Sequence, residues 1–298
     1  MCREVWSATD AAYPERSRTV RSLYKSRADR EVVARWCRER VTGHETRTAE
    51  LGDVRVHLTV IGEGPVETVL VPGTNFNAAT SLRFAAALAE CRTVAVVDLP
   101  GQPGLSSGRR PRAPHRGWYA AALSGALDAL DARGVTAVGH SLGAAVVAAC
   151  ESDRIAARAL ISPAGFTTLR LDARMMARST AWLLAPSPER TRAMLADFTA
   201  PGNTAPDEIA DWLTLTAVHC RSTLAPPPLP DAVFRRLRGT PLAVAVGEHD
   251  RFLPPARLAP AVRAALGVEL RVLPGVGHLA VDEEPETIAA LVGSLREG

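Results

Sequence analysis

The chain has 298 residues, of which 47% are hydrophobic and 22% charged, and its formal net charge is +3 at pH 7. These proportions are ordinary for a soluble globular protein and argue against a disordered chain or a membrane protein. Its arginines and lysines are scattered and are not interleaved with aromatic residues, so we expect no nucleic acid partner.

The cysteines and the amino-terminal residues indicate the cellular compartment of the protein. Five cysteines are widely spaced and form no Cys-x-x-Cys pair, so we expect neither a disulfide framework nor a bound metal. The first residues lack the apolar run of a secretory signal, and no stretch is long enough for a membrane span. We therefore predict a cytoplasmic protein.

Residues 1–49 are rich in charge and carry apolar side chains partly at helical spacing, which predicts a helical extension of one or two amphipathic helices. Such an extension packs on the body of the protein, borders a pocket or binds a partner, and packing is the simplest of these. Residues 50–60 then alternate as in a β-hairpin.

Two further apolar runs lie at residues 69–71 and 94–97. The first run is followed by Pro72, Gly73 and Thr74. The second run is followed by a glycine-containing segment that begins at Asp98 and ends at Ser106.

The most informative motif is Gly139-His140-Ser141-Leu142-Gly143, which lies between a β-branched run and an alanine- and valine-rich segment. Glycines two residues before and after a serine leave room for the strained strand-to-helix turn from which a nucleophile projects. The turn also places backbone amides at a helix amino terminus, where they stabilise negative charge on a substrate oxygen. Ser141 is therefore the candidate nucleophile.

Strand patterning stops between residues 165 and 238, where Ser187-Pro188 and Pro206-Asp207 are helix start signals. We expect a helical cap here, with Trp182 and Trp212 among its bulky apolar residues. Regular strands then resume.

An acidic residue and then a histidine follow Ser141 in the sequence, each of them after a predicted strand. Residues 241–246 predict a strand that delivers Asp250 into a proline-rich loop, and residues 268–273 predict a strand that is followed by His278. Functional groups gather at the carboxyl ends of parallel strands, so these three residues are expected to meet although they are distant in sequence.

In these motifs the chain resembles the α/β-hydrolase superfamily over residues 51–298, in particular its serine carboxylesterase-like branch with a helical lid. The resemblance implies an α/β fold with a mostly parallel eight-stranded sheet, flanking helices and an inserted helical cap. The core is expected to comprise residues 50–164 and 239–298, and the cap residues 165–238.

The resemblance also implies roles for individual residues. Ser141, Asp250 and His278 correspond to the catalytic triad, and the backbone amides of Thr74 and Leu142 to the oxyanion hole. The substrate pocket is expected to include Asn75, Phe76, His140, Trp182 and Trp212. Pro72 departs from the family pattern, which usually has a histidine before the glycine and uses it to order the oxyanion loop.

The expected function is cleavage of a small, hydrophobic carboxylic ester through an acyl-enzyme intermediate, with no cofactor. A thioesterase or a carbon–carbon bond hydrolase would use the same triad. A receptor-like protein that binds a small molecule with little turnover is a further alternative, and the oligomeric state stays open.

Overall fold

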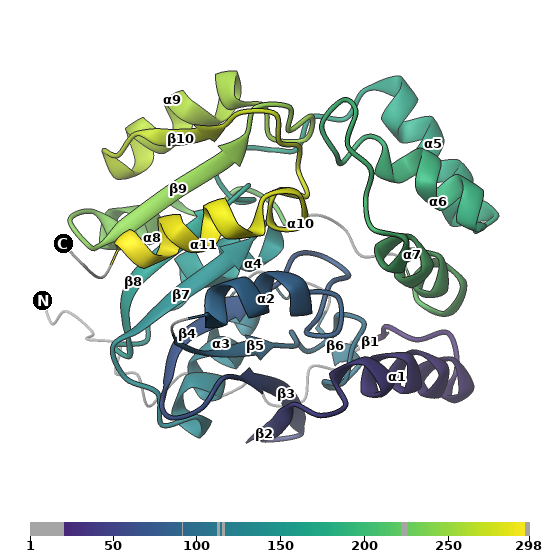
Figure 1. The fold of residues 1–298 in the computed structure, drawn as a ribbon, viewed down its shortest axis with the longest axis horizontal. Coiled ribbons are helices and arrows are strands. Elements are labelled where there is room, and N and C mark those ends of the chain that lie inside the picture. The colour runs from purple at the N-terminus through teal and green to yellow at the C-terminus, as the bar shows by residue number, and fades with distance from the viewer. Residues whose placement is uncertain (1–20, 91, 112–113, 115–116, 222–225, 296–298) are drawn as a thin grey trace, which may run out of the picture.

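The computed structural model describes residues 21–90, 92–111, 114, 117–221 and 226–295. An eight-stranded sheet with the order β10-β9-β8-β7-β4-β5-β3-β2 runs through the centre of the molecule (Figure 1). Its strands are β2 (Glu45–Leu51), β3 (Val54–Ile61), β4 (Val66–Val71), β5 (Thr93–Val97), β7 (Val135–His140), β8 (Ile155–Ile161), β9 (Leu242–Gly247) and β10 (Leu270–Leu273).

The sheet is parallel from β10 to β5, whereas β3 pairs antiparallel with β5 and β2 pairs antiparallel with β3. The central strands β5 and β7 are buried along their whole length. Parallel strands of this kind are covered by helices on both faces, which explains why they are continuous apolar runs. This arrangement confirms the predicted α/β fold with a mostly parallel eight-stranded sheet.

Helices cover both faces of the sheet, and each face has its own apolar cluster. One cluster contains residues of α3 (Trp118–Ala129), α4 (Leu142–Ala149), α8 (Asp231–Leu237) and α9 (Pro255–Leu266). The other contains residues of α2 (Leu82–Ala89), α10 (Ala280–Glu283) and α11 (Pro285–Ser294).

Three further helices lie beyond the carboxyl ends of the strands, namely α5 (Ala173–Leu184), α6 (Pro188–Leu195) and α7 (Asp207–His219) (Figure 1). Both expected helix starts are present, because the Ser187 hydroxyl caps α6 by accepting from the Arg190 amide at 3.2 Å and α7 begins directly after Pro206. Helix α8, although within the range expected for the cap, packs against α4 and α9 of the core. We propose that α5, α6 and α7 constitute the cap.

The described part of the amino-terminal region contains one helix, as expected, and differs from the expectation in its strands. Residues 1–20 of the predicted extension lie outside the described residues, and its described part contains a short strand β1 (Arg21–Ser22) and one helix, α1 (Arg27–Val41). Strand β1 pairs with β6 (Arg109–Arg110). The hairpin begins at Glu45 and not at Glu50, because Glu45 already pairs with Val60, so the sheet begins inside the predicted extension.

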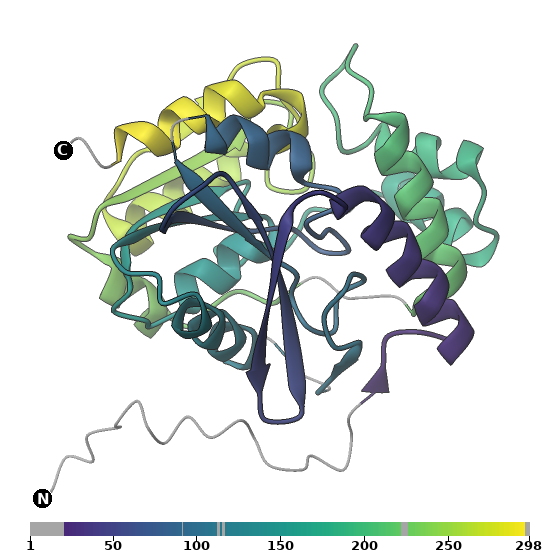
Figure 2. The same ribbon diagram turned by 60° about the horizontal axis from the view of Figure 1, so that its bottom comes forward.

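Helix α1 packs against α7, which places α1 beside the proposed cap (Figure 2). The ring of Trp36 lies 4.6 Å from that of Trp212, and the Arg40 guanidinium pairs with Glu208. None of the helices in the described part of the chain combines the length and the apolar character that crossing a bilayer requires.

Candidate active site

Ser141 occupies a strained turn between β7 and α4, with a φ of 52° and a ψ of −112°. The two flanking glycines are required because the surrounding backbone leaves no room for a Cβ atom at either position. A Cβ atom on Gly143 would lie 1.8 Å from the Val71 carbonyl oxygen, and one on Gly139 would lie 2.5 Å from the backbone of Ala144. The helix therefore packs so closely on the strand ends that only glycine fits, and this packing holds the serine in a conformation that side chains rarely adopt.

The structure brings Ser141, His278 and Asp250 together in one hydrogen-bonded chain. His278 Nε2 lies 3.1 Å from Ser141 Oγ, and His278 Nδ1 lies 2.8 Å from Asp250 Oδ2. These residues come after β7, β10 and β9, so three strand ends converge on one point. The imidazole thus has a hydroxyl on one nitrogen and a carboxylate on the other, as a general base for serine requires.

Asp250 is buried but is well supplied with hydrogen-bond donors. Its Oδ1 accepts from the backbone amides of Phe252 at 3.0 Å and Leu253 at 2.9 Å. Burial alone would raise the pKa of this carboxyl, but the charge and hydrogen bond of His278, together with the Leu253 amide, outweigh burial and hold the pKa below its ordinary value. The carboxylate is therefore ionised at neutral pH and orients the imidazole.

His278 is held in place by Glu283, a residue that the sequence motifs did not reveal. Glu283 Oε1 accepts from the backbone amide of Gly277 at 2.9 Å, directly before the histidine. Its Oε2 accepts from the Ala200 amide at 2.9 Å and from Asn203 Nδ2 at 2.7 Å. Glu283 thereby ties the histidine loop to the segment that comes after α6. The only signal in the sequence would have been its position on a short helix just after the histidine.

The loop after β4 carries Thr74 and is fixed at its neighbour Asn75. Asn75 has a φ of 66°, its amide donates to Gln102 Oε1 at 3.0 Å, and its carbonyl accepts from Trp212 Nε1 at 2.6 Å. Within the described residues, neither the Thr74 amide nor the Leu142 amide donates to a protein acceptor. Both amides are thus available to a ligand oxygen, whereas the Asn75 amide is already used.

The residues expected to line the pocket have different surroundings. His140 is buried, and its Nε2 donates to the His278 carbonyl at 2.8 Å. Burial, and next the nearby His278, lower the pKa of His140 to about 4, so its ring is neutral. Trp212 is completely buried and contacts the loop after β4, while Trp182 is 8% exposed and packs in the same apolar cluster. Contact of these residues with a substrate stays a prediction.

Apolar rings surround the histidine. The rings of Phe252 and Phe198 lie 5.1 Å and 5.9 Å from that of His278, and Phe76 is half-buried on the oxyanion loop. Such surroundings exclude water and strengthen electrostatic interactions within the site. Phe198 belongs to the bulky apolar residues of the range expected for the cap, whereas Phe252 was not expected from the sequence to be a site residue.

Comparison with known proteins relates this geometry to a family. The family model described as the alpha/beta hydrolase family matches residues 68–291. A search of curated proteins by sequence found no match.

Similar solved structures include two carboxylesterases from Bacillus subtilis. Naproxen esterase (carboxylesterase NP) has a TM-score of 0.72 and 15% identity, over 90% of this chain and 96% of that one. Carboxylesterase CesB has a TM-score of 0.68 and 16% identity, over 90% and 95%. A third is the 2-hydroxy-6-oxo-6-phenylhexa-2,4-dienoate hydrolase from a Rhodococcus strain, with a TM-score of 0.64 and 21% identity over 86% and 100%. At these identities the likeness concerns the fold.

Proposed function

This chain belongs to the alpha/beta hydrolase family, and from that premise we propose that it is a serine esterase that cleaves a small, hydrophobic carboxylic ester. The observation that carries the proposal is the continuous contact from Ser141 Oγ through His278 to Asp250, at 3.1 Å and 2.8 Å. A serine is nucleophilic when an adjacent base removes its proton and a third group orients that base.

The proposed reaction has two stages. Ser141 Oγ attacks the acyl carbon while His278 Nε2 takes the hydroxyl proton, and Asp250 stabilises the imidazolium that forms. The substrate oxygen, now negative, accepts hydrogen bonds from the amides of Leu142 and Thr74. His278 then gives its proton to the departing alcohol and leaves an acyl-serine. His278 next takes a proton from a water molecule, which attacks the acyl carbon. His278 returns this proton to Ser141 Oγ as the bond between the acyl group and the serine breaks and the acid leaves.

Two features support an ester of low polarity. The aromatic rings around His278 favour apolar groups beside the reacting carbon. Two of the similar solved structures are carboxylesterases, which is a further argument for an ester, although it rests on similarity of fold. The likeness to a dienoate hydrolase keeps carbon–carbon bond cleavage with the same three residues as the second candidate.

Labelling with a fluorophosphonate probe tests the activated serine. We expect one adduct on Ser141, located by mass spectrometry, which is lost in Ser141→Ala and in His278→Ala. Ser294→Ala is a matched control, because Ser294 lies on α11 and donates to the Leu291 carbonyl, and it should label like the native protein. Absence of labelling in the folded native protein would contradict the proposal and favour the receptor-like alternative.

A substrate panel then distinguishes the reactions. p-Nitrophenyl esters of short and medium acids, the matching thioesters and a vinylogous diketone are compared by kcat/KM. We expect the highest value for the esters. A labelled serine together with faster turnover of the diketone would support the second candidate instead.

A further inference from the structure

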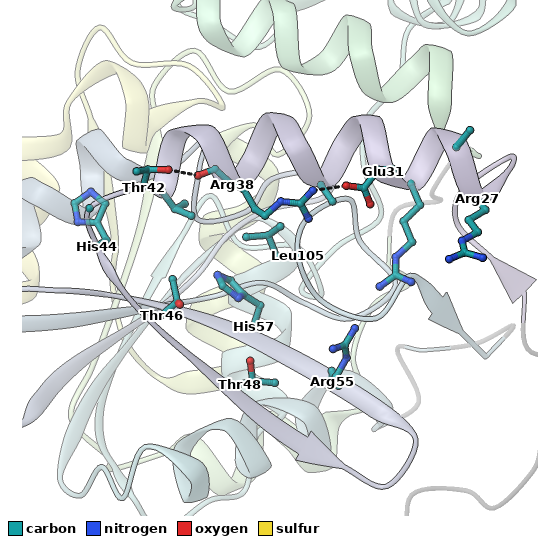
Figure 3. Close-up of a pocket in the computed structure, with 16 residues that line it drawn as sticks. Arg27, Glu31, Arg38, Thr42, His44, Thr46, Thr48, Arg55, His57 and Leu105 are labelled. Carbon is teal, nitrogen blue, oxygen red and sulfur yellow. Dashed lines mark hydrogen bonds and ion pairs between the residues drawn. The ribbon is translucent and has the colours of Figure 1, made fainter.

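A cleft of about 1170 Å³ lies between α1 and the β2–β3 hairpin (Figure 3). Its lining comes from α1, from both strands of the hairpin and from Gly104 and Leu105 of the loop after β5. None of the triad, oxyanion or predicted pocket residues belongs to this lining. The cleft is therefore separate from the candidate catalytic residues, and the proposed esterase reaction does not use it.

The lining is strongly cationic. It contains Arg27, Arg30, Arg38 and Arg55, against Glu31 as the one carboxylate among its members. Glu31 pairs with Arg38. In the part of the chain that the structure describes, no ion pair neutralises the other three arginines.

The arginines approach the cleft from opposite walls. Figure 3 shows Arg27 and Arg38 on the α1 side and Arg55 with His57 on the β3 side. Gathering positive charges across one cleft is unfavourable unless solvent or a bound anion screens them, because like charges repel at short range. An anion seated between the walls would contact guanidinium groups from both.

We propose that this cleft binds a ligand that carries phosphate groups. The planar guanidinium fork donates two parallel hydrogen bonds to a phosphate, and arginines are therefore preferred for phosphate recognition. Three forks that have no ion-pair partner among the described residues suit a group with several negative charges better than a single carboxylate.

The volume of the cleft and its remaining lining residues restrict which phosphate-containing ligands fit. The volume of about 1170 Å³ lies slightly above the roughly 300–1,000 Å³ of ordinary small-molecule sites and far exceeds what a single phosphate ion fills. None of the described residues that line the cleft is Phe, Tyr or Trp, so this lining offers no stacking platform of the kind that single-stranded nucleic acids require. Ala34, Val41 and Leu105 offer a small apolar floor. A soluble organic polyphosphate and the headgroup of an anionic phospholipid share the chemistry that fits.

Titration calorimetry with tripolyphosphate at low ionic strength tests the proposal on the full chain. The double variant Arg30→Gln/Arg55→Gln removes one unpaired arginine from each wall. The matched control is Arg35→Gln/Arg235→Gln, whose arginines are exposed on α1 and α8 and do not line the cleft. Both doubles lose the same charge at exposed positions, and circular dichroism verifies that both fold.

We expect the cleft variant to bind tripolyphosphate at least about tenfold more weakly, since each lost arginine fork removes charge-assisted hydrogen bonds, and the control to stay within about twofold. Equal weakening in the two doubles would overturn the proposal, because it would show attraction to net charge alone. Binding of citrate as tight as that of tripolyphosphate would refute the preference for phosphate.

Vesicle sedimentation distinguishes the two sources of phosphate. Binding to phosphatidylglycerol but not to phosphatidylcholine vesicles, lost in the cleft variant, would assign the site to a lipid headgroup. Tripolyphosphate binding without vesicle binding would assign it to a soluble ligand. If the native protein binds neither probe, the proposal is wrong. These readouts do not involve hydrolysis, so they are independent of the proposed esterase activity.

Discussion

Trp212 connects the proposed cap to the loop after β4, which carries the proposed oxyanion donor Thr74, and Trp212→Phe tests that connection. Its indole is completely buried, stacks near Trp36 and donates through Nε1 to the Asn75 carbonyl at 2.6 Å. Phenylalanine keeps an aromatic ring but cannot donate this hydrogen bond. Asn75 comes directly after Thr74, whose amide is a proposed oxyanion donor, so the loss acts next to the reacting oxygen.

Two contributions set the magnitude. The lost hydrogen bond leaves the Asn75 carbonyl without its donor, which costs about 1–3 kcal/mol. The smaller ring leaves space in a fully buried position, which costs about 1 kcal/mol more. We therefore expect the free energy of unfolding to fall by about 2–4 kcal/mol. Loss of an oxyanion donor costs about a hundredfold or more in rate, and a displaced donor should cost about tenfold.

The assay combines urea denaturation with the rate of fluorophosphonate labelling at Ser141. Trp36→Phe is the control, because it makes the same chemical change in the partner ring, which is half-buried and touches α7 from α1. The control should lose about 1 kcal/mol of stability, part of it from the Arg40 guanidinium 3.6 Å from the ring centre, and should keep the native labelling rate. Equal labelling rates in the two variants would refute a role for Trp212 in holding the oxyanion loop.

Two further predictions concern the turn after His278. Burial raises the pKa of Asp282 from 3.8 to about 7, and its Oδ2 has no hydrogen-bond partner among the described residues. The folded protein therefore holds a proton that the unfolded chain releases, so stability falls as pH rises from about 4 to 7. In urea denaturation, Asp282→Asn should be more stable than the native protein at pH 8, by up to about 4 kcal/mol. The difference in stability should vanish near pH 4. A difference in stability that does not change with pH would contradict this prediction. Glu283→Ala removes the acceptor for the Gly277 amide and should slow fluorophosphonate labelling of Ser141 about tenfold, because His278 is displaced. The control Glu269→Ala breaks an exposed pair with Arg263 and should not slow labelling. Equal labelling rates in these two variants would exclude a positioning role for Glu283.

The sequence predicted local structure correctly where the residues that cause that structure all lie in one short segment. The glycines around Ser141 predicted a tight strand-to-helix turn, and the structure has it with a positive φ at the serine. The proline after Ser187 likewise predicted the start of α6. In both cases the backbone preference belongs to the residues themselves, so no distant contact is needed to infer it.

The boundaries of elements and the contacts that support the candidate site were harder to predict from the sequence. The hairpin begins at Glu45 because that residue pairs with Val60, although its exposed strand residues show little alternation. The range expected for the cap includes α8, which packs on the core. Strand pairing and helix packing depend on partners far along the chain, and a run of local residues does not reveal them.

The sequence by itself determined the sharp turn at Ser141 and the set Ser141, Asp250 and His278, because glycine spacing and strand-end positions are local properties. Only the tertiary structure decided that these three residues lie within hydrogen-bond distance and that Trp212 and Glu283 brace the two loops beside them. It alone also placed the unpaired arginines of α1 and β3 around one cleft. The physical reason is that such contacts join residues up to 137 positions apart, so they exist only once the sheet has brought its strand ends together.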